Sequence, residues 1–463
     1  MPQAGTVDKP HRLPLVAMPL NRGSTPDKDG RLVNCYVEKN EMGDHWIYKR
    51  AGLLADTALS GAGQGTFNWN GDIYAIFGAS LYKNGVSVGT VDATGGKYHF
   101  SSCLGGIPKL QLGNGVKAYN YDISGGLVQI IDANFPAPFV KGFTYLDGTT
   151  YVMDSSAAIH GSNLNDPTTY DPLNLILAQI EPDKGVGISK QLVYLVALKQ
   201  WSTEMFYDAG NPAGSPLGPV QGAKANYGCV SIDTLQDIDG ALFWVSTNKS
   251  GSAQIVILSA QKASAISTKA VEKLLDGADF STAMSWQYKA DGHSFYVVTI
   301  KSLNLTLSYD VAEHLWCQWT DTNGNYMPII DFVVRDNMDF LVQHESNGKL
   351  YKMSSAYTSD DDALFSVDIY TPNFDGEVDR RKHLNVMRIN ADQQVGSTLQ
   401  VRKNDDDYDP AKWSNFRSVD LSNQRPFLTG CGTFYRRAHH FHHRSDTKLR
   451  IKSIDLQLDM GVL

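Results

Sequence analysis

The sequence predicts an all-β protein that has a β-propeller-like domain of six or seven blades and, after it, a C-terminal antiparallel β-domain. Three observations support this fold class. The 463 residues include 41 Gly, 22 Tyr and 18 Phe, a composition that favours strands and tight turns. Short strand patterns recur at intervals of roughly 35 to 50 residues, as in four-stranded propeller blades. After residue 357 a second composition begins, in which apolar and polar positions alternate.

Each recurring unit starts with a turn pair and continues into an aromatic-rich strand. Asn-Gly and Asp-Gly supply the positive φ angles that a tight hairpin needs. Six or seven such units between residues 61 and 355 favour a propeller, while a β-sandwich or a chain of hairpins remains the alternative. The units are Asn70-Gly71 before residues 73–77, Asn114-Gly115 before 116–119, Asp147-Gly148 before 149–153, Lys190-Gln191 before 192–196, Asp239-Gly240 before 241–245, Asp291-Gly292 before 294–298 and Asp336-Asn337 before 339–342.

The chain divides into three expected parts. Residues 1–60 are expected to form an extended N-terminal arm with docking strands, residues 61–357 the propeller-like domain, and residues 358–463 a β-sandwich or platform. One short helix is expected at residues 267–275, where four apolar residues share a face before Gly277. Strands of the C-terminal domain are expected at residues 365–370, 383–390, 398–403, 448–453 and 454–458.

The net charge of −8 argues against tight binding of nucleic acid, because DNA-binding proteins usually carry a basic excess that neutralises phosphates. It is compatible with DNA that passes nearby without being held. We expect no secretory signal and no membrane span, since the apolar run 191–198 is far too short. The cysteines are scattered and odd in number, so they are expected to be reduced, buried thiols. They are Cys35, Cys103, Cys229, Cys317 and Cys431.

No motif in the sequence predicts catalysis, a metal ion or a cofactor. Residues 61–65 are glycine-rich but lack the lysine and the following helix of a phosphate-binding loop, so they are read as a flexible turn. The acidic residues 404–409 could hold a hard cation, but the Gly and Glu of an EF-hand are missing, which favours a hairpin tip. No nucleophile elbow or triad spacing is present. Paired carboxylates for glycoside cleavage would be invisible in sequence, so a hydrolase stays an alternative.

The run His439-His440-Phe441-His442-His443 is the most conspicuous local feature. In a strand, His440 and His442 would share one face. Two histidines on a face do not close a tetrahedral zinc site, and no Cys or carboxylate lies at ligand spacing. The run is therefore predicted to be a basic strand or loop on the solvated surface, with an intersubunit contact or a pH-sensitive interface as the alternative. Its basic flanks are Arg436, Arg437 and Arg444.

Several segments resemble the packaged-DNA stabilisation proteins of short-tailed bacteriophages. Residues 31–38, RLVNCYVE, resemble the N-terminal motif of that family, and residues 72–85 resemble its first blade. The end of the chain follows the family's order of acidic turn, Trp-Ser, aromatic-basic strand, Leu-Arg and terminal strand. These segments are residues 401–407, 413–415, 434–437, 448–451 and 454–459. Two departures are Asp407-Tyr408 in place of a glycine pair, and Tyr435-Arg436-Arg437 in place of an Arg-Trp-Arg-Arg run.

The resemblance implies a non-enzymatic tail hub or nozzle subunit, assembled in the host cytoplasm and located in the virion tail. Such proteins form a homo-hexameric ring below the portal and adaptor, close the tail after packaging and conduct DNA during ejection. The implied partners are the head-to-tail adaptor, tail fibre, spike or needle proteins, and double-stranded DNA that passes through the lumen without sequence-specific binding. A tail-associated glycan hydrolase and a receptor-binding propeller are the alternatives. The candidate interface residues are Arg31, Asn34, Tyr36, Arg436, Arg437, His440, His442 and Arg444.

Overall fold

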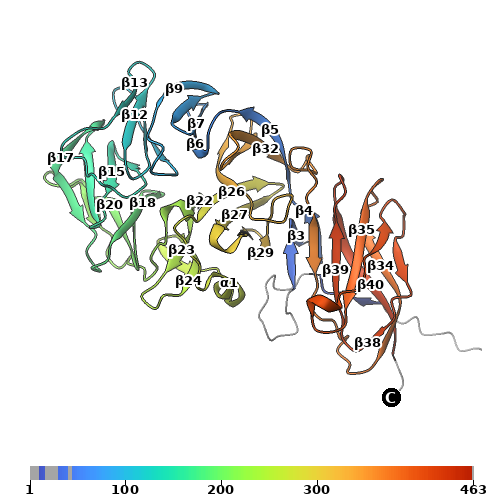
Figure 1. The fold of residues 1–463 in the computed structure, drawn as a ribbon. Helices are drawn as coiled ribbons and strands as arrows, with labels where there is room; N and C mark the ends of the chain where they lie inside the picture. The colour runs from blue at the N-terminus through green and yellow to red at the C-terminus, as the bar shows by residue number, and fades with distance from the viewer. Residues whose placement is uncertain (1–9, 16–29, 40–43, 461–463) are drawn as a thin grey trace, which may run out of the picture.

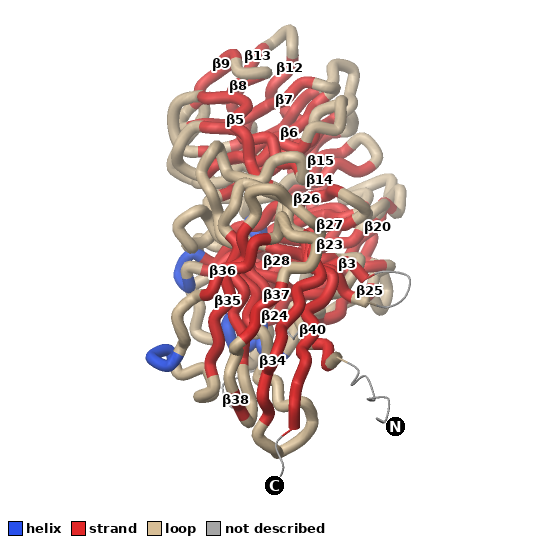
Figure 2. The backbone as a smooth tube through the Cα atoms, turned by 90° about the vertical axis from the view of Figure 1, so that its right-hand side faces the viewer, coloured by secondary structure: helices blue, strands red, loops and turns tan. Residues whose placement is uncertain are grey.

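The computed structural model describes residues 10–15, 30–39 and 44–460. Within the predicted N-terminal arm, residues 1–60, the segments 1–9, 16–29 and 40–43 lie outside the described residues. Figure 1 shows two bodies, a ring of small sheets and a β-sandwich beside it. Figure 2 shows that the backbone consists of strands and loops with a few short helical segments. The all-β prediction is confirmed, and within the described ranges no helix has the length and apolar character needed to cross a membrane.

The ring is a β-propeller. Six of its antiparallel sheets are separate and four-stranded, and β26–β29 form a further blade whose sheet continues into the sandwich. The prediction of a propeller with six or seven blades is confirmed. The strands of the first three blades are β6–β9 (Gly63–Trp69, Asp72–Phe77, Ser80–Lys83, Val86–Thr90), β10–β13 (His99–Cys103, Lys109–Gly113, Ala118–Asp122, Gly126–Gln129) and β14–β17 (Thr144–Leu146, Thr149–Met153, Ala158–Asn163, Asp166–Leu177).

The remaining blades follow in chain order. They are β18–β21 (Gly185–Gln191, Tyr194–Lys199, Thr203–Asp208, Leu217–Pro219), β22–β25 (Gln236–Ile238, Ala241–Thr247, Ala253–Ser259, Lys262–Ala265), β26–β29 (Met284–Ala290, His293–Ile300, Leu305–Asp310, Leu315–Gln318) and β30–β32 (Ile329–Val334, Phe340–His344, Lys349–Ser354) completed by β5 (Gly52–Ala58). The propeller also contains three short helical segments, two between blades and η2 within the blade of β26–β29. These are η1 (Ile232–Thr234), α1 (Lys269–Leu275) and η2 (Lys301–Leu303).

Strand β5 closes the ring. It comes from the N-terminal segment and forms the outermost strand of the last blade, where it pairs antiparallel with β32 in a register that places Leu54 opposite Lys352. The first strand of that blade, β30, lies against β6 of the first blade. Because strands from both ends of the propeller sequence share one sheet, the ring can open only if this sheet comes apart.

The hairpin turns mostly follow the predicted chemistry. The first turns of four blades are Asx-Gly pairs in which both residues have positive φ, namely Asn70-Gly71, Asp147-Gly148, Asp239-Gly240 and Asp291-Gly292. The predicted helix is present as α1, and Thr268 caps it by accepting from the Val271 amide. One turn was predicted wrongly. Lys190 and Gln191 end β18, and the turn is Leu192-Val193, with Leu192 at φ 53°.

The sandwich consists of two sheets that combine strands from both ends of the chain. One sheet contains β1 (His11–Arg12), β3 (Cys35–Lys39), β4 (His45–Lys49), β34 (Lys382–Ala391), β37 (Phe427–Thr429), β38 (Thr433–Phe434) and β40 (Arg450–Met460). The other contains β2 (Arg31–Val33), β33 (Val367–Tyr370), β39 (Ala438–His443), β35 (Thr398–Asn404) and β36 (Arg417–Asp420), and β2 joins it to β29 of the propeller. The segments 448–453 and 454–458 were expected as two strands, but one strand, β40, covers most of both.

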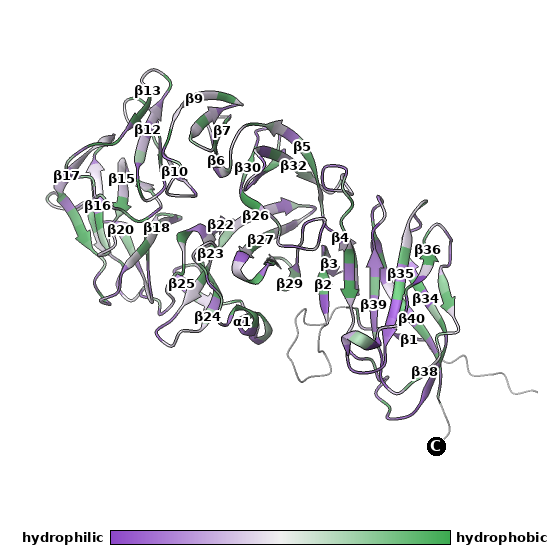
Figure 3. Ribbon diagram, in the orientation of Figure 1, coloured by the Kyte–Doolittle hydropathy of each residue, from purple (hydrophilic) through white to green (hydrophobic). Residues whose placement is uncertain are grey.

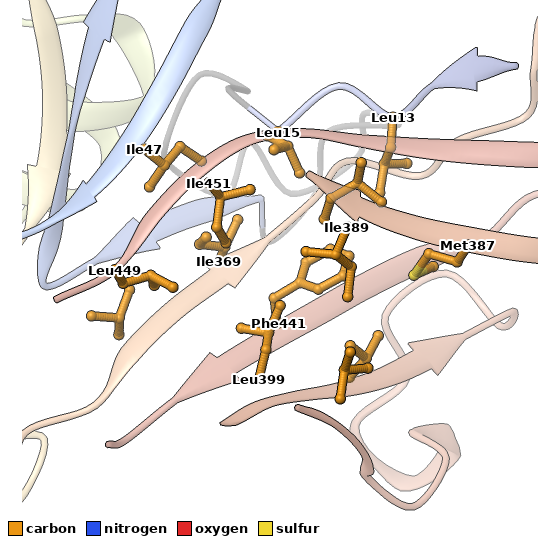
Figure 4. Close-up of a cluster of buried hydrophobic side chains, with 14 of the residues drawn as sticks. Leu13, Leu15, Ile47, Ile369, Met387, Ile389, Leu399, Phe441, Leu449 and Ile451 are labelled. Atoms are coloured by element: carbon orange, nitrogen blue, oxygen red, sulfur yellow. The ribbon is translucent and has the colours of Figure 1, made fainter. Parts of the chain in front are cut away.

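The core of the sandwich lies between its two sheets. Figure 4 shows Leu13, which follows β1, and Ile47 of β4 in one cluster with Ile389, Phe441 and Ile451 from the C-terminal strands. Figure 3 shows that apolar and polar residues alternate along these strands, which is how each sheet presents one apolar face to the other. The burial of apolar area therefore ties the two ends of the chain together. The short segment η3 (Pro410–Lys412) follows β35.

Candidate functional site

The histidine run forms strand β39 in the middle of a sheet. β33 pairs with one edge of β39 and β35 with the other. His439, His440 and His443 are buried, and His442 is partly buried. The prediction of a solvated surface strand was wrong, because the two neighbouring strands and the opposite sheet cover the run. Neither neighbour could be read from the run itself, since both are distant in sequence.

Asp368 of β33 brings a carboxylate to the face that His440 and His442 share. Its Oδ1 lies 2.7 Å from His440 Nε2 and 2.7 Å from His442 Nδ1, and its Oδ2 accepts from Ser366 Oγ at 2.7 Å. Burial alone would raise the pKa of Asp368, but the hydrogen bonds from the two histidines hold that pKa below its ordinary value. The three ligand atoms are close enough for one metal ion. Asp368 could not be linked to the histidine run from sequence, because it lies 72 residues before His440.

Arg402 of β35 decides the chemistry of this group. Its Nε donates to His440 Nδ1 at 2.8 Å. Because arginine can only donate, Nδ1 is the acceptor, and a neutral His440 carries its proton on Nε2 and donates it to Asp368. That proton occupies the position through which a metal would bind. We therefore describe Asp368, His440 and His442 as a hydrogen-bonded network, stacked on Tyr370 with ring centroids 3.9 Å apart for His440.

The acidic hairpin after β35 uses its carboxylates within the chain. Asp405 receives two hydrogen bonds from the buried guanidinium of Arg437, at 2.6 and 2.9 Å. Asp407 accepts from Asn373 at 2.7 Å. Asp407 and Tyr408 have φ angles of 54° and 65°, the left-handed region that a glycine pair would adopt without a steric cost. The departure from the family's glycine pair thus changes the residues while the backbone keeps the conformation that glycine favours.

Tyr408 compensates for its backbone conformation through its side chain. The side chain is buried. Its hydroxyl donates to the Thr371 carbonyl, and its ring packs against Trp413 with centroids 5.5 Å apart. The expectation that this segment is a hairpin tip rather than a cation site agrees with these contacts, because Asp405 and Asp407 already have partners in the described chain.

The candidate interface residues divide by burial. Asn34, Arg437 and His440 are buried, and Arg31, Tyr36 and His442 are partly buried, so these six contact the chain itself. Arg31 lies over the ring of Tyr370 at 4.3 Å, and Tyr36 stacks on Tyr48 at 5.3 Å. Arg436 and Arg444 are exposed. A contact with another subunit is open to Arg436 and Arg444 and remains a prediction.

Arg50 joins the propeller to the sandwich. It lies between β4 and β5, and its side chain is fully buried. Its guanidinium donates to both carboxylate oxygens of Asp360, at 3.0 and 2.6 Å, and to the Thr320 carbonyl at 3.0 Å. Its Nε donates to Asn34 Oδ1 at 2.9 Å, and the ring of Phe365 lies 3.7 Å from the guanidinium carbon. Propeller and sandwich therefore share a bidentate ion pair at their junction.

Ion pairs connect distant blades near the axis of the propeller. Lys97, in the connection before β10, lies 3.0 Å from Asp331 of β30 and donates to the Ser285 carbonyl of β26 at 3.3 Å. The blade of β10 is adjacent to neither of those blades, so Lys97 reaches across the centre of the ring. Asp233 of η1 pairs with His99 and Lys141, each at 2.7 Å.

One rim of the propeller exposes apolar side chains at its turns. Leu104 and Ile107 lie in the β10–β11 turn, Leu164 in the β16–β17 turn, and Leu192 and Val193 in the β18–β19 turn, with exposed fractions between 56% and 69%. These turns leave the blades from the same end, because strands within a blade alternate in direction. A methyl group built on Gly105 would lie 2.7 Å from the Asn165 carbonyl, so the first two turns are adjacent. We call these five residues the apolar rim.

Comparisons with known proteins identify the ring. A family model described as Bacteriophage P22 Gp10, β-propeller, matches residues 29–358. No curated protein matches the chain. Among solved structures, the N-terminal domain of Nup159 has a TM-score of 0.40 at 11% identity, covering 70% of this chain and 98% of its own. The extracellular domain of a one-component system from B. thetaiotaomicron has a TM-score of 0.42 at 11% identity, covering 86% and 58%. Scores this low carry no argument about function.

Proposed function

Because this chain belongs to the bacteriophage family of P22 Gp10 β-propeller proteins, which stabilise packaged DNA, we propose that it is a tail hub or nozzle subunit. Six copies form a ring below the portal and adaptor. The ring closes the tail to retain packaged DNA and conducts that DNA during ejection. The family is a structural one, and the chain acts in the virion as a scaffold without a catalytic step of its own. The family match over 71% of the chain, residues 29–358 of 463, carries this proposal.

The propeller axis supports a DNA path outside the individual subunit. Lys97, Asp331 and Asp233 occupy the centre of the ring of blades, and Lys97 is only 7% exposed. The contacts of Lys97 with Asp331 and Ser285 lie across the path that a duplex would take along this axis. They therefore support a DNA channel that several copies of the chain enclose. The net charge of −8 suits a channel wall that does not hold a polyanion.

The junction supports a role as a stiff ring segment. Arg50 and Asp360 connect the propeller to the sandwich, and β2 continues the sheet of β26–β29 directly into the sandwich. A shared sheet and a buried bidentate pair resist hinge motion between the two bodies. A subunit that must keep its position in a closed ring needs such stiffness.

The apolar rim supports contacts with other tail proteins or with neighbouring copies. Leu192 and Val193 occupy a hairpin turn at which four other blades have Asx-Gly pairs, and Leu192 accepts a left-handed backbone there. Apolar residues in a tight turn contradict the turn's preference for Asx-Gly and give no packing benefit within the chain. Such a departure indicates a role in binding another protein.

Electron microscopy of the purified full-length chain, alone and mixed with heads that lack tails, tests the proposal. The expected result is six-fold rings, and density added below the portal when heads are present. The Leu192→Asp, Val193→Asp double variant should lose the rings or the attachment. Ile131 follows β13 and is 85% exposed, at the end of the blades opposite to the apolar rim. Ile131→Asp is therefore the matched control and should behave as the original chain.

Two other results would contradict the proposal. Trimming of host capsule or lipopolysaccharide by the purified chain would indicate the hydrolase alternative. Binding of the isolated chain to host cells, without rings and without attachment to heads, would indicate the receptor-binding alternative.

A further inference from the structure

A cavity, separate from the apolar rim, lies in the sandwich beside β35. Its volume is about 260 Å³, and both apolar and basic residues line it. The apolar residues include Val401 and Leu428 together with Met387. This size is slightly below the range of drug-sized ligand sites, so the cavity fits a small molecule.

Four cationic residues line the cavity, Arg402, Lys403, Arg417 and Arg437. Arg437 pairs with Asp405, but Lys403 and Arg417 have no carboxylate partner among the described residues. Lys403 Nζ donates to the Cys431 carbonyl at 2.8 Å, and Arg417 donates to the Thr429 carbonyl at 2.7 Å. Both side chains retain further donors after these bonds. The described residues that line the cavity include no Asp or Glu.

The wall of the cavity also contains unused hydrogen-bonding capacity. His439 lines the cavity and is 2% exposed, and its Nδ1 is buried without a partner among the described residues. Burial, together with the charges of Arg437 and Lys403, lowers the pKa of His439 to about 3, so the ring is neutral. Burial and the neighbouring Arg437 also lower the pKa of Lys403, and the nearby charge of Asp405 only partly offsets them.

We infer that this cavity binds a small organic anion, a carboxylate on an apolar stem. The carboxylate lies between Lys403 and Arg417, which have free donors and no acidic partner, and the stem lies along Val401 and Leu428. Charge-assisted hydrogen bonds fix the head, and burial of the stem adds the apolar contribution. An inorganic anion would satisfy the cations but would leave the apolar residues uncovered. The ligand class therefore follows from the apolar and the basic lining residues together.

Isothermal titration of the full chain with sodium octanoate, and separately with inorganic phosphate, tests the inference. Octanoate should bind saturably with one site per chain, and phosphate much more weakly. Lys403→Gln and Arg417→Gln should each weaken octanoate binding about tenfold, which is the loss of one charge-assisted hydrogen bond. Lys403→Arg should retain binding, because it keeps the charge. Arg436→Gln is the matched control, since Arg436 is an exposed cation of the same domain that does not line the cavity, and it should leave binding unchanged.

Three results would overturn the inference. They are the absence of saturable octanoate binding to the original chain, octanoate binding unchanged in a correctly folded Arg417→Gln variant, and phosphate binding as tight as octanoate binding. Arg417 is exposed, so its substitution does not require repacking, and circular dichroism of each variant verifies the fold. None of these results depends on whether the chain forms a ring.

Discussion

Arg50 and Asp360 are 310 residues apart in sequence, yet the Arg50 guanidinium donates to both carboxylate oxygens of Asp360, the shorter bond being 2.6 Å. Arg50 lies between the sandwich strand β4 and the propeller strand β5, and Asp360 lies in the link from the propeller back to the sandwich. Each link between the two bodies thus contributes one partner. The pair fixes both links at the same point.

Arg50→Met should destabilise the protein by about 3 to 5 kcal/mol, because it leaves the Asp360 carboxylate and the Thr320 carbonyl without their buried donor. Urea denaturation followed by tryptophan fluorescence would measure the loss. Arg335→Met is the control, since Arg335 makes a similar bidentate contact with Asp56 at the surface, at 2.7 and 2.6 Å, and surface pairs contribute about 1 kcal/mol or less. Equal losses in the two variants would contradict a special role for the junction.

His439 and His443 should make the sandwich sensitive to acid. Burial lowers the pKa of each to about 3, whereas the unfolded chain protonates histidine near pH 6.5. The contribution of these neutral histidines to the free energy of unfolding is therefore fully present above pH 6.5 and is lost as the pH decreases toward 3. At pH 5 the loss should be about 2 kcal/mol per histidine. His439→Leu should reduce the dependence of the free energy of unfolding on pH, because it removes one of the two titrating groups. Leucine can replace His439 because the histidine side chain makes no hydrogen bond to described residues. Denaturation midpoints at pH 7 and pH 5 would show this, and His11→Leu, at an exposed position, should leave the slope unchanged.

The sequence predicts the blades well because each blade is a local object. A pair such as Asp239-Gly240 determines its own turn, and strands adjacent in sequence are adjacent in the sheet. The Leu192-Val193 turn could not be predicted in this way, because neither residue has a preference for tight turns. The surrounding fold holds Leu192 in its strained backbone conformation.

The sandwich and the histidine network were less predictable because their contacts are long-range. β39 pairs with β33 and β35, and the register that places Asp368 opposite His442 cannot be read from either strand alone. The same holds for Arg402, whose donor selects the tautomer of His440. The strands β33 and β35 bury the histidine run. The alternating pattern predicts that these strands exist, but it does not show which strands are neighbours in the sheet.

Leu192→Gly should stabilise the isolated chain while weakening its assembly. Leu192 has φ 53° and is 63% exposed. Glycine therefore removes a steric cost of about 1 kcal/mol in the folded state. Part of this gain is lost, because glycine increases the conformational entropy of the unfolded chain. The net gain should be about 0.5 kcal/mol, measurable as a rise in Tm. Leu164→Gly is the control, because Leu164 is equally exposed on the apolar rim but lies outside the positive-φ residues; it should lower Tm. A fall in Tm for Leu192→Gly would contradict a strained turn.

Lys97→Met should loosen the ring of blades rather than one blade. Lys97 connects the segment before β10 to β26 and β30 through Ser285 and Asp331, and the remaining Asp331 carboxylate would keep only its bond from the Thr66 amide at 2.8 Å. Removing one partner of a buried ion pair leaves the other charge unpaired and lowers the free energy of unfolding by about 3 kcal/mol or more. Hydrogen exchange should therefore become faster in the inner strands β6, β26 and β30 together. Lys289→Met, which removes an exposed pair with Asp239, should leave these strands protected. Faster exchange confined to β10 would mean that the axis contacts do not couple the blades.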